Sequence, residues 1–345
     1  MRKGLNLIFS LLFGLAVFGF FFYRSGVEEV FSVFANIQPL YIGIFFFISS
    51  LTFVPTVWRW GIVLNAHKKT IPFLSLLKYT IVGYAVSYVT PSVKVGGEPL
   101  RAYMLNKEYK VDLKTASSSI IIEKFVEFLG GVILGLIGFA LFFSLPGINI
   151  LIKLIVGISL LIGFVLLTIL YYRSVTGKGS FSTLFVFFRL NKIARWKNFV
   201  YTIRGVEKHM HKFFAESKKA FFLSFLTYLL YMILVVFEFK FLLLGLGIDE
   251  SLRTVLLSIT VAGFVNFIPV PAALGFLEAG QASLFSLVRK EGSIGFALSI
   301  VTRIRALIFV AIGFSLITYF SGNRIGEKVS LFGCKKKNSS KKGKG

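Results

Sequence analysis

Long apolar segments follow one another along almost the whole of this 345-residue chain, with short polar turns between them. A helix needs about 20 mainly apolar residues to cross the hydrocarbon core of a bilayer. Only 16% of the residues are charged, against about 25% in ordinary soluble domains, so a soluble fold would have to bury nearly every segment. The pattern predicts an all-α polytopic membrane protein with about six transmembrane helices, at residues 5–23, 39–57, 115–145, 150–172, 221–246 and 294–320.

Charged and aromatic residues flank the first two apolar segments. A basic N-terminus precedes residues 5–23, and no small-residue cleavage site follows, so we interpret this stretch as an uncleaved first span. The second segment ends in Trp58-Arg59-Trp60. Because tryptophan and arginine are favoured at the level of lipid headgroups, this tripeptide is predicted to anchor the helix at the interface.

Two regions are better explained by helical hairpins that enter and leave the membrane on one side. Residues 72–114 are interrupted by prolines and glycines, and residues 254–268 and 276–288 are each too short to span. If every segment crossed once, the basic loop at 173–219 would lie outside, against the positive-inside rule. Two opposed re-entrant hairpins place the basic segments and both termini in the cytoplasm. This arrangement is typical of inverted-repeat transporters, whose interrupted helices meet near the midplane.

The net charge of +24 is concentrated in two segments. Residues 173–219 hold eleven Lys or Arg against two Glu, and residues 322–345 hold eight against one Glu. Both flank apolar spans, where basic residues orient the protein and attract anionic lipid, so nucleic acid is not an expected partner. Within the transmembrane domain at 1–321, the basic loop is predicted to be an amphipathic segment lying on the inner or plasma membrane. The tail from 322 is predicted to be disordered.

Few side chains suit metal binding or covalent catalysis. Cys334 is the only cysteine, which excludes an internal disulfide and cysteine-based metal sites, and three histidines are too few for a convincing metal cage. We therefore expect no catalytic residue, no metal and no cofactor.

The first interruption is a candidate site for a phosphate group. Gly96 and Gly97 allow close backbone approach, and Lys94 and Arg101 lie nearby. Glu98 and Arg101 are three residues apart, so they could pair on one face of a helix. The alternative is an ordinary cytoplasmic loop with a surface ion pair.

The second interruption runs from Pro269 through Pro271 to Gly275, and Glu278 follows in an otherwise apolar half-helix. A carboxylate at membrane depth is costly unless it is paired or protonated, which marks it as a functional candidate. The alternative is that Glu278 reaches the interface or faces a structural arginine.

Further charged residues fall within predicted spans. Arg303 and Arg305 lie about 200° apart around one helix, so they are expected to face different partners among the available acids. Glu123 and Glu127 share one helical face and could carry protons, or could form salt bridges with Lys124 and Arg101. These alternatives stay open, as does the pairing with Glu238 and Glu278.

The order and spacing of these motifs resemble the lysylphosphatidylglycerol synthase transmembrane region family, the flippase-like part of bacterial multiple peptide resistance factors. The resemblance covers nearly all of residues 5–320. One departure is that the family's typical Pro-Gly-Gly-Leu-Gly at the second interruption is Pro271-Ala-Ala-Leu-Gly275 here, which puts close substrate approach in doubt. The matching positions are Arg59-Trp60, Pro91, Gly96-Gly97-Glu98-Pro99, Arg101, Glu123, Asn266, Pro269, Gly275, Glu278 and Arg303.

The resemblance implies that the protein moves a lipid between leaflets, with an anionic phospholipid or a polyprenyl-phosphate-linked lipid as partner. Only a tail follows Phe320, so no aminoacyl-transfer domain is expected and an enzyme is disfavoured. A membrane-embedded enzyme or an accessory protein of lipid or glycolipid biosynthesis is the alternative. A scaffold whose basic loop recruits a partner is less favoured, because an inert helix seldom carries two arginines at depth.

Overall fold

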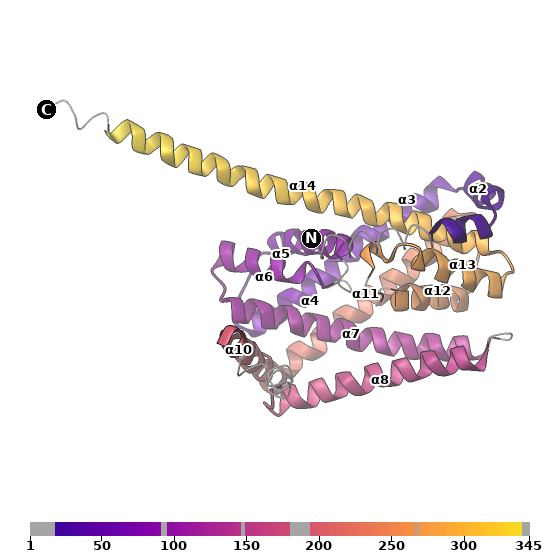
Figure 1. Cartoon of the computed structure of the whole chain (residues 1–345), viewed down its shortest axis with the longest axis horizontal. Helices are drawn as coiled ribbons and strands as arrows, with labels where there is room; N and C mark the ends of the chain where they lie inside the picture. Colours follow the sequence, from indigo (N-terminus) through magenta and orange to yellow (C-terminus); the bar gives the residue numbers. More distant parts are fainter. Residues whose placement is uncertain are drawn as a thin grey trace.

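The computed structural model describes residues 18–90, 95–145, 149–179, 194–265, 268 and 270–339, and every regular element in these ranges is helical. The chain is an all-α polytopic membrane protein, as the apolar pattern predicts (Figure 1). Five of the six predicted spans are long and apolar enough to cross a membrane; the first, residues 5–23, lies mostly outside the described residues. These five are α3 (Pro39–Leu51) with α4 (Phe53–Ala66), α7 (Leu113–Phe143), α8 (Ile150–Val175), α11 (Lys218–Gly245) and the first part of α14 (Gly292–Ser339).

The second span is longer than predicted and is interrupted at Thr52. Pro55 has no N–H to donate to the carbonyl of the preceding turn, which explains why helix α3 ends and α4 begins here. Because α4 continues to Ala66, Arg59 and Trp60 lie inside the bundle, 2% and 0% exposed. The interpretation of this tripeptide as a headgroup anchor is therefore wrong for these two residues.

Both predicted hairpins are present as pairs of short helices around a break. The first consists of α5 (Phe73–Val89) and α6 (Glu98–Tyr109), with Pro99 in the first turn of α6 where proline is well tolerated. The second consists of α12 (Leu252–Val265) and α13 (Phe276–Val288), with a single 3₁₀ turn, η2 (Pro271–Ala273), between them.

The two hairpins open at opposite ends of the bundle. At one end the hydroxyls of Ser75 and Tyr109 lie 2.6 Å apart and join the start of α5 to the end of α6. At the other end Arg289, after α13, pairs with Glu250, before α12, at 2.6 Å. Figure 1 shows α6 and α10 at the first end and α2 (Val27–Ala35) and α13 at the second.

Helix α10 (Ala194–Glu216) forms part of the first end, which we call the basic end. Its buried residues Val206, Met210, Phe213 and Phe214 pack in one cluster with apolar residues of α4, α7 and α8. This part of α10 therefore packs against protein. The predicted amphipathic pattern lies mainly before it in the chain, and the side chains of residues 194–200 lie outside the described residues. The earlier part of the predicted amphipathic loop, residues 180–193, lies outside the described residues.

Helix α14 runs along both hairpins and packs most extensively against α5 and α13. Glycines permit this close approach, because a Cβ at Gly313 would overlap Ala85 of α5 and one at Gly295 would overlap the carbonyl of Gln281 in α13. The helix continues through residue 321 to Ser339, so no change of secondary structure marks the predicted start of the tail. The division into two domains stays a prediction.

Candidate functional site

The first break is held closed by a contact between backbones. The N–H of Gly97 donates to Ser87 Oγ at 2.8 Å, and a Cβ at Gly97 would overlap the carbonyl of Gly83. Glycine is therefore required at Gly97 by close approach. Gly96, its half-buried neighbour, has no such contact described, and Lys94 lies outside the described residues.

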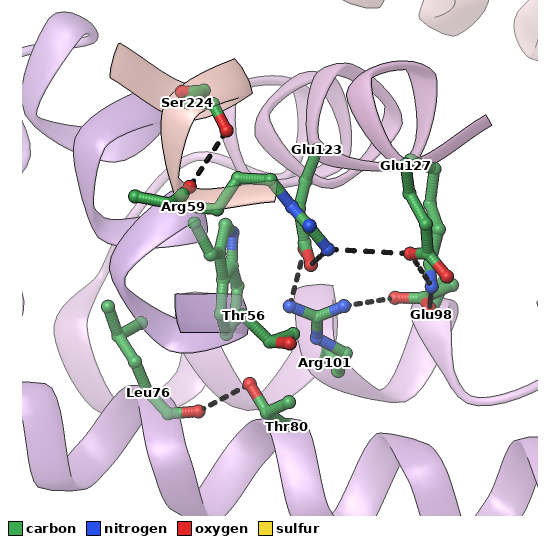
Figure 2. Close-up of polar contacts among 12 residues, drawn as sticks. Thr56, Arg59, Leu76, Thr80, Glu98, Arg101, Glu123, Glu127 and Ser224 are labelled. Carbon is green, nitrogen blue, oxygen red and sulfur yellow. Dashed lines mark hydrogen bonds and ion pairs between the residues drawn. The ribbon is translucent and has the colours of Figure 1, made fainter. Parts of the chain in front are cut away.

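Three cations and three carboxylates form a closed ring of alternating charge next to this break (Figure 2). Each carboxylate contacts two cations, and each cation contacts two carboxylates. Helix α4 supplies one cation, α6 a carboxylate and a cation, and α7 the remaining three residues. The members of this charge ring are, in order around it, Glu98, Arg101, Glu123, Arg59, Glu127 and Lys124.

The contacts around the charge ring differ in length. Arg101 is held most closely, with Nη1 2.7 Å from Glu98 Oε2 and Nη2 2.7 Å from Glu123 Oε2. Lys124 Nζ lies 3.2 Å from Glu98 and 2.9 Å from Glu127. Arg59 Nη2 is more distant, 3.4 Å from Glu123 and 3.5 Å from Glu127. The two Arg59 contacts are therefore the weakest in the ring.

Aromatic rings complete the surroundings of the two arginines. The guanidinium carbon of Arg101 lies 4.1 Å from the centre of the Trp60 ring, and that of Arg59 lies 5.8 Å from the Tyr228 ring. Trp60 is itself fixed by donating from Nε1 to Ser119 Oγ at 3.1 Å. Cation–π contacts of this kind stabilise a guanidinium that has lost its water.

Both arginines nevertheless keep unused donors. Arg59 Nε and Nη1 and Arg101 Nε are buried and have no hydrogen-bond partner among the described residues. Buried donors are nearly always bonded in folded proteins, so an unused one needs an explanation. The charge ring can therefore accept a further hydrogen-bond acceptor, such as a phosphate oxygen.

A second cluster lies where the break of the other hairpin meets α14, and we call it the mid-span cluster. Arg303 donates from Nε to Glu278 Oε1 at 2.7 Å and contacts the same oxygen through Nη2. Its Nη1 lies 3.3 Å from the carbonyl oxygen of Ala272 and 3.5 Å from the hydroxyl of Tyr88, at the end of α5. The other Glu278 oxygen accepts from the N–H of Gly275 at 2.9 Å and so caps α13.

The backbone of the second break adopts left-handed conformations at alanine. Ala272 and Ala273 have φ of 55° and 50°, and Gly275 has φ of 80°. Such values cost of order 1 kcal/mol for alanine but little for glycine. Alanine therefore has not prevented the backbone from taking glycine-like angles here. Pro271 is buried in the same turn, and Pro269 lies outside the described residues.

Arg305 belongs to neither cluster. It pairs with Glu238 of α11, whose Oε1 also accepts from Ser49 Oγ at 2.6 Å. The expectation that Arg303 and Arg305 face different acids therefore agrees with their geometry. Of the candidate residues, Glu98, Arg101, Glu123 and Glu127 come together in the charge ring, and Gly275, Glu278 and Arg303 in the mid-span cluster.

Sequence reasoning missed two members of the charge ring as site residues. The sequence predicts Arg59 at the interface because the apolar segment is predicted to end at residue 57, although apolar residues continue to Ala66. Lys124 is expected from the sequence to pair with the neighbouring acids or to contribute to phosphate binding, but it is not among the predicted site residues. In the part of the chain that the structure describes, no three His, Cys, Asp or Glu side chains are grouped so that they could hold a metal ion.

Comparisons with known proteins agree with the motif order. The family model described as the lysylphosphatidylglycerol synthase TM region matches residues 7–313. A UPF0104 membrane protein of Methanothermobacter thermautotrophicus is 25% identical over 319 residues, which cover 88% of this chain and 92% of the relative. A UPF0104 membrane protein of Methanocaldococcus jannaschii is 26% identical over 126 residues, 36% of each chain. No solved structure matches the chain.

Proposed function

The chain belongs to the lysylphosphatidylglycerol synthase transmembrane region family, and we propose that it moves an anionic, phosphate-bearing lipid between the two leaflets of the cell membrane. The lipid is a phospholipid or a polyprenyl-phosphate-linked lipid. In this proposal the protein is a transporter, and its charged clusters hold the headgroup while the acyl chains stay in the hydrocarbon region.

The observation that carries the proposal is the position of Arg303. It lies within the apolar span of α14 and contacts both hairpins, through Tyr88 at the end of α5 and through Ala272 in the second break. Irregular backbone within a membrane is tolerated beside protein or a polar cavity, and transporters use such breaks to bind substrate near the midplane. A charged residue that joins two opposed breaks is expected of that architecture and has no evident use in a passive anchor.

The cations available to a phosphate lie in two places. Arg59, Arg101 and Lys124 belong to the charge ring, and Arg303 belongs to the mid-span cluster. Arginine suits this task because its planar fork of donors matches a phosphate group. The carboxylates keep these cations compensated while no lipid is bound.

We place the basic end on the cytoplasmic side of the inner or plasma membrane, with both termini cytoplasmic. The support is the positive-inside rule, because α10 and its flanking segments carry most of the charge of the loop at 173–219. Cysteines introduced one at a time into a Cys334→Ser background test this orientation. Labels at Lys208 of α10 and Glu250 before α12 are expected to react from opposite sides of the membrane.

The function is tested with the full chain in liposomes that contain a fluorescent phosphatidylglycerol. We expect the wild type to increase the rate at which the label becomes accessible from outside, and Arg303→Gln to reduce that rate about tenfold or more. Arg253→Gln is the matched control, since Arg253 is exposed and bonds Ser144 at the far end of α7. If no anionic lipid moves faster than in protein-free liposomes, the proposal is overturned.

A further inference from the structure

The charge ring has no net charge when all its members are ionised, since three carboxylates balance three cations. Four members have side chains that are 10% exposed or less, so the ring is a largely dry environment. An anion that enters it adds an uncompensated negative charge. Because an uncompensated buried charge is strongly unfavourable, anion binding needs a compensating positive charge to arrive with it.

We propose that the charge ring binds a lipid phosphodiester together with one proton, and that Glu127 takes up this proton. The inference rests on the proposed function and extends it, because it makes lipid movement a proton-coupled process. The proton forms an O–H bond on the Glu127 carboxylate, and no covalent bond of the lipid changes. The ring carries no net charge before binding, and the ring with its bound phosphodiester and proton carries none afterwards.

Glu127 is the member best placed to exchange a proton with its surroundings. Its side chain is 36% exposed, compared with 18% for Lys124, 10% for Glu98 and 0% for Glu123. It also has the longest contact in the ring, 3.5 Å to Arg59. A proton can therefore reach Glu127 without passing the buried members of the ring.

Protonation of Glu127 would release the cations that a phosphate needs. Arg59 and Lys124 would each lose one of their two carboxylate partners, while Glu123 and Glu98 would still hold the other side of each. Arg59 already has two unused donors and Arg101 has one. A phosphodiester oxygen could then accept from Arg59 and Lys124 in place of the neutralised carboxyl group.

Among the described residues, the groups that face Glu127 come from four helices. Arg59 of α4 and Lys124 of α7 contact it directly, and Glu98 of α6 is reached through Lys124. Tyr228 and Tyr231 of α11 lie close enough to interact with its charge. Glu98 and Glu123 keep their own cation partners around the ring.

The test measures proton uptake when the purified full-length protein, in weakly buffered detergent solution, binds short-chain phosphatidylglycerol. Phosphatidylcholine serves as the lipid control because its headgroup has the same phosphodiester but no net charge. For the wild type we expect uptake of about one proton per bound phosphatidylglycerol and none with phosphatidylcholine, and an affinity that falls about tenfold per pH unit on the alkaline side.

The variant Glu127→Gln imitates the protonated side chain. It is expected to bind phosphatidylglycerol without proton uptake and with an affinity that no longer changes with pH. Glu216→Gln, which alters an exposed carboxylate at the end of α10, should behave like the wild type. If Glu127→Gln does not fold, the wild-type proton count still decides whether lipid binding is coupled to proton uptake.

The outcomes separate the two proposals. Phosphatidylglycerol that binds and moves without proton uptake by the wild type overturns proton coupling and leaves lipid transport standing. Equal proton uptake by the wild type and Glu127→Gln overturns the assignment to Glu127. If phosphatidylglycerol neither binds nor moves, lipid transport fails and the inference fails with it.

Discussion

The pair formed by Glu278 and Arg303 allows a quantitative test of the mid-span cluster. The side chain of Glu278 is 0% exposed and that of Arg303 is 13% exposed. Removing one partner of a buried ion pair costs about 3–5 kcal/mol, because the other charge is left uncompensated. Glu278→Gln keeps an oxygen that can accept from the Gly275 N–H, so it removes the charge and little else.

The contacts left behind set the expected magnitudes. In Glu278→Gln, Arg303 keeps Ala272 and Tyr88 as neutral partners, so we expect a loss near the lower limit, about 3 kcal/mol. In Arg303→Met, the stranded carboxyl group can take up a proton, and we expect a loss of about 2 kcal/mol. The double variant carries no buried charge at this site and should lose only about 1–2 kcal/mol, so the coupling energy is about 3–4 kcal/mol.

Unfolding of the purified protein in mixed micelles with increasing SDS measures these free energies. The exposed pair of Lys240 and Asp249, in which the aspartate side chain is 80% exposed, provides the control cycle. Its coupling energy should stay below about 1 kcal/mol, because exposed pairs are solvated in both states. Additive losses at Glu278 and Arg303 would refute the reasoning, as would a Glu278→Gln variant as stable as the wild type.

Three further predictions concern the breaks and the basic end. Gly97→Ala should destabilise the protein by about 3 kcal/mol in the same unfolding assay, because the added methyl group has no space. Gly43→Ala is the control, since Gly43 has open space around it and the substitution should not destabilise the protein. Equal losses of stability in the two variants would contradict the close approach at Gly97. Ala272→Gly should stabilise by about 0.5–1 kcal/mol, since it relieves a left-handed alanine, and a loss of stability would argue against that conformation. Burial, and then the charges of His209 and Lys212, lower the pKa of His67 to about 4. The stabilisation by neutral His67 is therefore complete above pH 6.5 and is lost as the pH falls toward 4. The loss in unfolding free energy is about 1 kcal/mol at pH 5 after allowance for solvent screening. His67→Gln should abolish this part of the pH dependence.

The hairpins were predictable because local chemistry determines them. Proline and glycine at residues 91–99 and 269–275 prevent a continuous helix, and the arms of the second hairpin are too short to span. The positive-inside rule then favours hairpins that open at opposite ends, as the contacts at Ser75 and Arg289 show them to do. Apolar length and charge placement thus specify most of the architecture.

The pairing of charges could not be predicted in the same way. Glu123, Glu127, Glu238 and Glu278 are all possible partners for Arg303 and Arg305. The distance in sequence between an acid and an arginine does not show which helices lie side by side. Glu238 and Arg305 are 67 positions apart in the sequence, and they pair only because α11 and α14 lie close together here. The prediction for Arg59 is wrong for a related reason. The sequence around an arginine near the end of an apolar segment is the same whether the helix ends there, at the interface, or continues past it.

The end of α5 connects the charge ring with the mid-span cluster. Ser87 accepts from Gly97 in the first break, and the next residue, Tyr88, contacts Arg303 beside the second break. The residues of α5 that contact the first break and Arg303 are therefore consecutive in the chain. Gly97 in turn precedes Glu98 of the charge ring, so the ring, the first break and the mid-span cluster are joined through four consecutive covalent and hydrogen-bonded steps. In the proposed lipid transport, hairpins joined in this way are expected to move together, since alternating access requires the two breaks to open in turn.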